Sequence, residues 1–371
     1  MFKGMASNRI WFSEESKVRI NILTNLISKA TGGAIYDEVL YSKIFNECGN
    51  SVNCIVDAEF REEYKDVPVD FIRFALIYRK HSKEVLDCDY LITNSRLYTR
   101  FILFPWRIQR QRPRIIMIHH HYNYMTENGI KRRIHQRLEI AHLKRADIII
   151  TPNIYAAELG KQYGFDCKTM ILESTNINNQ VQKINRSTSK NFLFVGNVIE
   201  RKGVNYAIEA FSLFYKDHPD YKLIIIGSYD SEPNYKRFLD ELIARLQLKE
   251  AVVFRGRVTD EEKEEGYIQS RAFIFPSQNE GYGWVMVEAM KHGLPVVAFN
   301  NTAMPYTVNE SNGFIVDNRD VAKMADAMRV LADDDIIYRR LQEGALKTVT
   351  SLPDEDEINK QYDEFLKIFG I

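Results

Sequence analysis

The sequence predicts an α/β protein of two Rossmann-like domains, each built on a doubly wound parallel sheet. With 371 residues, the chain is longer than one ordinary hydrophobic core serves. Short apolar runs alternate with longer amphipathic ones, which is the pattern of repeated βα units. A polar tract rich in Asn and Ser lies between Asn176 and Lys190 and is typical of a linker. These features place one domain at 1–180 and the other at 190–352.

In the first half, the predicted strands are apolar runs too short for a helix, and the predicted helices have an apolar stripe with helical spacing. The strands are expected at 19–23, 52–56, 90–93, 115–118, 147–151 and 169–172, and the helices include 35–48 and 130–145.

The second half repeats the pattern with stronger signals. Its strands are expected at 192–195, 223–226, 252–254, 272–275 and 296–299, and its helices include 204–215, 234–246, 283–292 and 321–332. The final stretch, 353–371, starts with acidic residues and then shows an apolar face at Ile358, Tyr362, Phe365, Leu366 and Phe369. It is therefore expected to be a helix that packs against a core.

Composition narrows the class of protein. The formal net charge is zero, yet residues 101–150 hold ten Lys or Arg against three Asp or Glu. Such a local field attracts anionic partners. The four cysteines form no C-x-x-C pair, which favours reduced thiols in a cytoplasmic protein. Charged residues near the N-terminus and the absence of any long apolar run predict neither a signal peptide nor a membrane span.

Two glutamates dominate the chemistry that the sequence offers. Glu280 and Glu288 are eight residues apart, across the glycine-rich turn Gly281-Tyr282-Gly283 that leads into a helix. Glycines allow a ligand to approach backbone amides, and the start of a helix attracts an anion such as a diphosphate. Carboxylates accept hydrogen bonds from sugar and ribose hydroxyls. A solvated loop glutamate beside a surface-helix glutamate is the alternative, but Glu288 lies within an apolar run.

This motif lies between a strand that leads into Pro276-Ser277 and a helix that runs into Gly293-Leu294-Pro295. The arrangement resembles the nucleotide-sugar site of glycosyltransferase family 4, whose members are retaining enzymes with the GT-B fold. The resemblance implies that Glu280 lies against the donor sugar and that Glu288 holds the ribose. It also implies that the final helix, 353–371, packs back on the first domain.

A second motif, Val195-Gly196-Asn197 followed by Arg201-Lys202-Gly203, joins a strand to a helix. Cations beside a helix N-terminus suit a diphosphate and stabilise the charge that grows as it leaves. Members of the family usually have arginine where this chain has Asn197, so Arg201 is a candidate substitute. A solvated basic turn is the alternative.

Three further groups of residues complete the predicted site. His119 and His120 follow the strand expected at 115–118, and the resemblance places a histidine here against the donor sugar. A metal site built from His119, His120 and His121 is disfavoured, because successive side chains of an extended segment point in alternate directions. Gly32 and Gly33 resemble the family's phosphate loop, although an ordinary turn fits as well. Arg257, at the end of a strand, resembles a contact to the nucleotide base.

The basic stretch Arg107–Arg114, with Lys131, Arg132, Arg133 and Arg137, could bind an anionic membrane or simply face water. No nucleic-acid-binding motif accompanies the charge. A cytoplasmic protein is therefore expected, either free or in peripheral contact with the inner face of the membrane.

These observations predict a metal-independent retaining hexosyltransferase without a bound cofactor. The donor would be a UDP- or GDP-sugar, and the acceptor a glycan, a lipid-linked sugar or another hydroxyl. The predicted catalytic residues are His119, Arg201, Lys202 and Glu280. The predicted substrate-binding residues are Gly32, Gly33, His120, Asn197, Arg257, Gly281, Tyr282, Gly283 and Glu288.

Three alternatives stay open from sequence. They are a nucleotide-sugar epimerase of the same fold, a non-catalytic nucleotide-sugar-binding protein, and an NAD-dependent oxidoreductase. The last ranks low, because no G-x-G-x-x-G follows either first strand.

Overall fold

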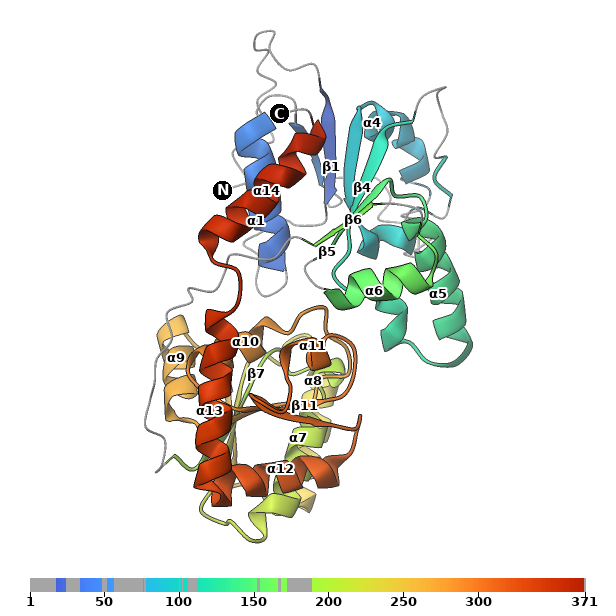
Figure 1. The fold of residues 1–371 in the computed structure, drawn as a ribbon. Helices are drawn as coiled ribbons and strands as arrows, with labels where there is room; N and C mark the ends of the chain where they lie inside the picture. The colour runs from blue at the N-terminus through green and yellow to red at the C-terminus, as the bar shows by residue number, and fades with distance from the viewer. Residues whose placement is uncertain are drawn as a thin grey trace. The chain divides into compact units, whose positions relative to one another are not determined.

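The computed structural model describes residues 18–24, 34–48, 52–56, 76, 78–99, 101, 103–105, 112–151, 154–165, 168–171 and 189–369. The chain divides into two compact units, one of residues 1–176 with 353–371 and one of residues 177–352. Most of the tract expected to be a linker lies outside the described residues. Each unit contains a six-stranded parallel sheet with helices packed against it, so the predicted fold class is confirmed (Figure 1).

In the N-terminal unit the strands are ordered β2-β1-β3-β4-β5-β6. They are β1 Ile20–Thr24, β2 Val52–Val56, β3 Tyr90–Asn94, β4 Arg114–Ile118, β5 Ile148–Thr151 and β6 Lys168–Ile171. The helices are α1 Ala34–Cys48, α4 Ser82–Leu86, η4 Ser95–Thr99, η5 Asn123–Thr126, α5 Gly129–Leu143 and α6 Ile154–Gln162. Six strands fall within two residues of the predicted positions, because continuous β-branched runs such as Ile148–Thr151 are buried on both faces.

The C-terminal segment of the chain belongs to this same unit. Helix α14, Glu355–Leu366, and the short η7, Lys367–Phe369, pack beside α1 with Tyr362 and Phe365 fully buried. The Lys43 ammonium donates to the Asn359 side chain at 2.6 Å, and the Tyr90 hydroxyl donates to the Ile368 carbonyl at 2.7 Å. The apolar face read from the sequence is thus the face that meets the core.

In the C-terminal unit the strands are ordered β12-β11-β10-β7-β8-β9, and every neighbouring pair is parallel. They are β7 Asn191–Val195, β8 Lys222–Ile226, β9 Val252–Gly256, β10 Ala272–Phe275, β11 Val296–Phe299 and β12 Gly313–Val316. The helices are η6 Glu200–Lys202, α7 Val204–Tyr215, α8 Pro233–Arg245, α9 Asp260–Gln269, α10 Trp284–Lys291, α11 Met304–Thr307, α12 Val321–Asp333 and α13 Asp335–Thr350. One continuous apolar core joins the sheet to these helices.

Strand β12 and the helices α4, α6, α9, α11 and α13 are not among the elements predicted from the sequence. Helix α9 has little amphipathic pattern, yet Thr259 and Glu262 form a capping box at its start. Helix α13 is capped by Asp334, the residue before its first turn, whose carboxylate accepts from the Ile336 and Ile337 amides. Residues that cap the start of a helix were therefore present in the sequence, even where apolar residues showed little helical periodicity.

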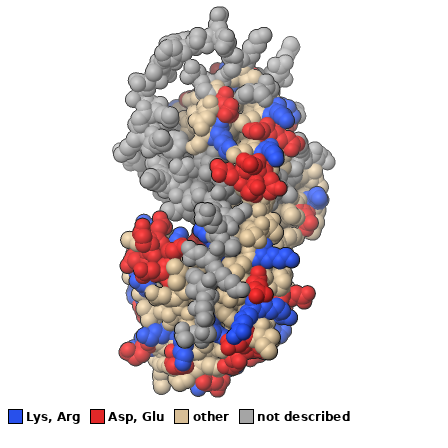
Figure 2. All heavy atoms as spheres, turned by 60° about the vertical axis from the view of Figure 1, so that its left-hand side comes forward, with Lys and Arg blue, Asp and Glu red and all other residues tan. Residues whose placement is uncertain are grey.

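The surface and helices add two observations. On the face drawn in Figure 2, the described Lys and Arg side chains are interspersed with Asp and Glu. None of the helices in the described part of the chain combines the length and apolar character needed to cross a bilayer.

We predict that Gly203→Ala lowers the free energy of unfolding of the C-terminal unit. Gly203 has φ +68°, and an added Cβ would lie 2.1 Å from the Pro276 carbonyl oxygen. Left-handed strain and the backbone clash together should cost about 2 kcal/mol or more. Gly256→Ala is the matched control, because φ is +67° there and the nearest atom is 3.9 Å away. Thermal unfolding should show the larger loss for Gly203→Ala, and equal losses would contradict the packing argument.

Candidate functional site

Most of the predicted site residues of the C-terminal unit follow two adjacent strands, β7 and β10, whereas Arg257 follows β9. From β7 the chain continues to β8 and β9 on one side, whereas β10, β11 and β12 extend the sheet on the other. Ligands of such sheets bind beyond the carboxyl ends of the strands at this reversal. The turn with Arg201 and Lys202 leaves β7, and the loop with Glu280 leaves β10. The topology therefore brings the two predicted motifs to one place.

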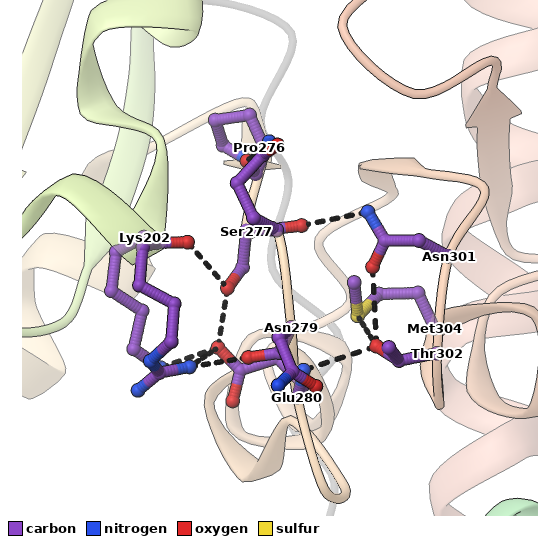
Figure 3. A network of polar contacts seen from close by, with 10 residues as sticks. Lys202, Pro276, Ser277, Asn279, Glu280, Asn301, Thr302 and Met304 are labelled. Carbon is purple, nitrogen blue, oxygen red and sulfur yellow. Dashed lines mark hydrogen bonds and ion pairs between the residues drawn. The ribbon is translucent and has the colours of Figure 1, made fainter. Parts of the chain in front are cut away.

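Glu280 is the centre of a buried polar network at this point (Figure 3). Its Oε1 accepts from the Lys202 ammonium at 2.5 Å and from the Ser277 hydroxyl at 2.6 Å. The Arg201 guanidinium lies 3.4 Å from the same oxygen and also donates to the Asn279 carbonyl. All the contacts that the carboxylate makes with described residues fall on Oε1, so Oε2 has no partner among them.

The charge of Glu280 is maintained by its two cations. Burial alone would raise the pKa of this carboxyl, but the charges of Lys202 and Arg201 more than offset it. The pKa therefore lies below its usual value, and Glu280 is ionised at neutral pH. A buried carboxylate without these partners would be costly.

A third loop, which follows β11, holds the backbone of Glu280. The Glu280 amide donates to the Thr302 hydroxyl at 3.0 Å, and that hydroxyl donates to the Asn301 side chain at 3.1 Å. The Asn301 amide group then donates to the Ser277 carbonyl at 3.0 Å. Together with the Ser277 hydroxyl, these bonds form a closed ring around Glu280 (Figure 3).

Thr302 adopts a backbone conformation that is rare for its residue type. Its φ is +42°, in the left-handed region that favours glycine, and a β-branched side chain is strained there. The strain is retained in a residue whose hydroxyl bonds the Glu280 amide. Thr302 is therefore best explained as a residue that positions Glu280.

Glu288 lies on α10 and is partly exposed, unlike Glu280. Its Oε2 accepts from the buried Tyr267 hydroxyl at 3.0 Å and lies 3.4 Å from the Lys263 ammonium. Tyr267 is fixed in turn by stacking on His292, with ring centroids 5.3 Å apart. One carboxylate oxygen of Glu288 is thus held by the protein, and the other can face a ligand.

The remaining predicted residues of this unit lie around the same edge. Gly281 and Tyr282 are partly buried in the loop before α10, and Tyr282 stacks on Trp284 at 4.0 Å. Gly283 has φ +83° at the start of α10, so a side chain would be strained there. Asn197 and Arg257 are exposed, in the segments that follow β7 and β9.

In the N-terminal unit, His119 and His120 are buried directly after β4, as the strand register predicts. The His119 Nδ1 lies 2.8 Å from the Ser95 hydroxyl, and Nε2 has no hydrogen-bond partner in the described part of the chain. Burial, with smaller effects of His120 and Arg96, lowers the pKa of His119 to about 3. The imidazole is therefore uncharged at neutral pH, with one nitrogen unbonded.

Several predicted features fall outside the described residues, namely Gly32, Gly33 and most of the basic stretch Arg107–Arg114. Among the described residues, no group of three or more His, Cys, Asp or Glu side chains is arranged to hold a metal ion.

Sequence reasoning missed Ser95, Tyr267, Ser277, Asn301 and Thr302. Four of them lie two or three residues beyond the ends of predicted strands, so the rule that sites form at carboxyl strand ends could have found them. Tyr267 had no such signal, because it lies on α9, which was not predicted.

Known proteins resemble this chain in sequence, most extensively in its C-terminal half. Residues 176–348 match the family model of group 1 glycosyl transferases. The capsular polysaccharide biosynthesis glycosyltransferase CapM of Staphylococcus aureus is 28% identical over 198 residues, which cover 51% of each chain. The chain spans about half the length, or less, of the curated relatives it matches.

Solved structures extend the likeness to both units. Sucrose-phosphate synthase from Thermosynechococcus elongatus has a TM-score of 0.72 at 18% identity, covering 95% of this chain and 99% of that one. HepE of Anabaena, in complex with UDP-glucose, has a TM-score of 0.68 at 18% identity, covering 95% and 100%. The chain thus has the two-domain GT-B fold, and its residues 176–348 match the group 1 glycosyl transferases.

Proposed function

We propose that this protein is a retaining hexosyltransferase that moves a sugar from a nucleoside-diphosphate donor to a hydroxyl of a glycan or lipid-linked acceptor. The observation that carries the proposal is the buried Glu280 with Lys202 and Arg201 at the sheet reversal. It lies within the segment that matches the glycosyl transferase model, and a structural neighbour was solved with UDP-glucose.

The two cations suit the diphosphate of the donor. Negative charge grows on the phosphate oxygens as the sugar leaves, and a cation fixed beside them lowers the energy of the transition state more than that of the bound donor. Lys202 and Arg201 are held by Glu280 before any ligand binds, so little ordering is left for the reaction. The amides at the start of α10 would add hydrogen bonds to the same group.

The two glutamates suit the hydroxyls at either end of the diphosphate. Oε2 of Glu280 can accept from the transferred sugar, while the second oxygen of Glu288 can accept from the ribose. Asn197, Gly281, Tyr282 and Gly283 would line the donor, and Arg257 the base. On the N-terminal unit, His119 and His120 are the residues that the family resemblance assigns to sugar contact.

The proposed reaction requires no resident cofactor and no metal ion, because Lys202 and Arg201 take the role of balancing the diphosphate charge. The bond from the anomeric carbon to the phosphate oxygen breaks, and the acceptor oxygen bonds to the same face of that carbon. The acceptor's proton passes to the departing phosphate oxygen. Undiminished transfer after treatment with EDTA is the expected result.

We predict that the uridine or guanosine diphosphate matching the donor raises the melting temperature of the protein. A ligand at about a hundred times its dissociation constant adds about 2.7 kcal/mol of stability. UDP, GDP and their sugars should be compared by thermal shift, and one base should give the clear response. If neither nucleotide shifts the wild type, donor binding is wrong. Incubation with the sugar nucleotide alone, followed by a search for an isomeric sugar, separates an epimerase from a transferase.

We predict that Lys202→Ala and Glu288→Ala each reduce transfer to an acceptor by about 100-fold, because both remove contacts to the departing nucleotide. Glu241→Ala serves as a control on an exposed part of α8. Steady-state rates should be measured with both variants shown to be folded. Rates close to wild type in both would remove these residues from the donor site.

We predict that Thr302→Val lowers kcat about tenfold or more, whereas Thr302→Ser keeps most of it. Valine preserves the branched shape but leaves the Glu280 amide without its acceptor, at a cost of about 1–3 kcal/mol. Serine restores that hydroxyl. Equal kcat values for the valine and serine variants would show that the hydroxyl does not position Glu280.

A further inference from the structure

Helix α5 of the N-terminal unit presents an outward face that the site does not use. Ile130 is 77% exposed and Ile134 is 52% exposed, although isoleucine is usually buried. Helical spacing puts Arg133, Arg137 and Lys144 on the same side, and all three are exposed. We name these five residues the α5 face.

The opposite side of α5 anchors the helix to its unit. Glu139 is fully buried and accepts from the Asn123 and Tyr124 amides, each at 3.0 Å. The Tyr98 hydroxyl lies 2.5 Å from a ring nitrogen of His135. These contacts fix the rotation of the helix, so the α5 face is turned away from the core. Helix α5 itself lies at the edge of its unit in Figure 1.

No carboxylate among the described residues pairs with the cations of the α5 face. In the described part of the chain, Arg133, Arg137 and Lys144 form no ion pair, and Glu139 is the one carboxylate on α5. The surface drawn in Figure 2, by contrast, mixes both signs. The α5 face therefore joins two exposed isoleucines to three cations that have no ion-pair partner among the described residues.

Residues 112–114, the described part of the basic stretch Arg107–Arg114, are weaker candidates for binding an anionic partner. Arg112 forms a two-pronged pair with Asp147 at 2.8 and 2.9 Å, and Arg114 lies over the Tyr90 ring. Such engaged cations offer little to an external anion.

We propose that the α5 face docks this protein on an anionic membrane surface. Helices bind there when apolar residues enter the headgroup boundary and Lys and Arg lie among anionic lipids. Nucleic acid would also attract the cations, but its charged backbone would gain nothing from contact with two exposed isoleucines, whereas a bilayer has an apolar layer that can bury them. The inference rests on the proposed function only in that a lipid-linked acceptor would be met at such a surface.

The test uses the full chain with phosphatidylcholine vesicles, with and without phosphatidylglycerol, in a sedimentation assay. The wild type should bind only the vesicles that contain phosphatidylglycerol, and the bound fraction should fall as the salt concentration rises. Ile130→Ser with Ile134→Ser, and Arg133→Glu with Arg137→Glu, should each lower the bound fraction about tenfold or more. The matched control is Ile336→Ser, because Ile336 is 84% exposed beside Asp334 and Asp335 on α13.

Nucleotide-induced thermal shifts of the same variants separate this inference from the proposed function. Double variants that keep the nucleotide-induced thermal shift but lose vesicle binding support docking through the α5 face. Vesicle binding equal to wild type in both double variants overturns it, as does a wild type that ignores anionic vesicles. Self-association lost in the isoleucine variant, without vesicle binding in the wild type, would instead assign the face to a second copy of the chain.

Discussion

The C-terminal unit depends on one constraint, which is that a buried carboxylate must keep its cations. Glu280 is stable as an anion because Lys202 and Arg201 reach it from the turn after β7. That turn fits because Gly203 allows the chain to pass against the Pro276 carbonyl, where any side chain would collide. Thr302 and Asn301 then tie in the loop after β11. Three loops that are distant in sequence are therefore fixed by the requirement to satisfy a single charge.

The sequence predicts features that depend on local patterns, but not features that depend on which strands are neighbours. Strands such as Ala272–Phe275 and Val296–Phe299 were predicted to the residue, because continuous apolar runs bounded by Pro, Gly and polar residues leave little choice of register. Strand β12, Gly313–Val316, was missed; it is as short as these two strands, but two of its four residues are only partly buried. Glu280, Lys202 and Arg201 could be proposed from their residue types. Their mutual contacts could not, because these depend on which strands are neighbours.

Thr302 shows why the rest of the site required coordinates. Nothing in the sequence near Asn301 marks a left-handed backbone, because threonine ordinarily avoids that conformation. The surrounding bonds, and not the residue's own preference, impose φ +42°. In the N-terminal unit, Ser95 is similar in kind. It meets His119 only because β3 and β4 are adjacent, and that adjacency is a property of the sheet order.

The arrangement around Glu280 also reconciles two demands that look opposed, namely pairing the carboxylate and binding a diphosphate with the same cations. An ammonium has three N–H donors and a guanidinium has five, whereas Glu280 accepts one hydrogen bond from each. The carboxylate therefore orients Lys202 and Arg201 without exhausting them. A diphosphate that arrives meets donors already in place, and Glu280 stays charged beside it because its contacts need not break. Preorganisation of this kind lets a static network favour the charge that develops late in a reaction.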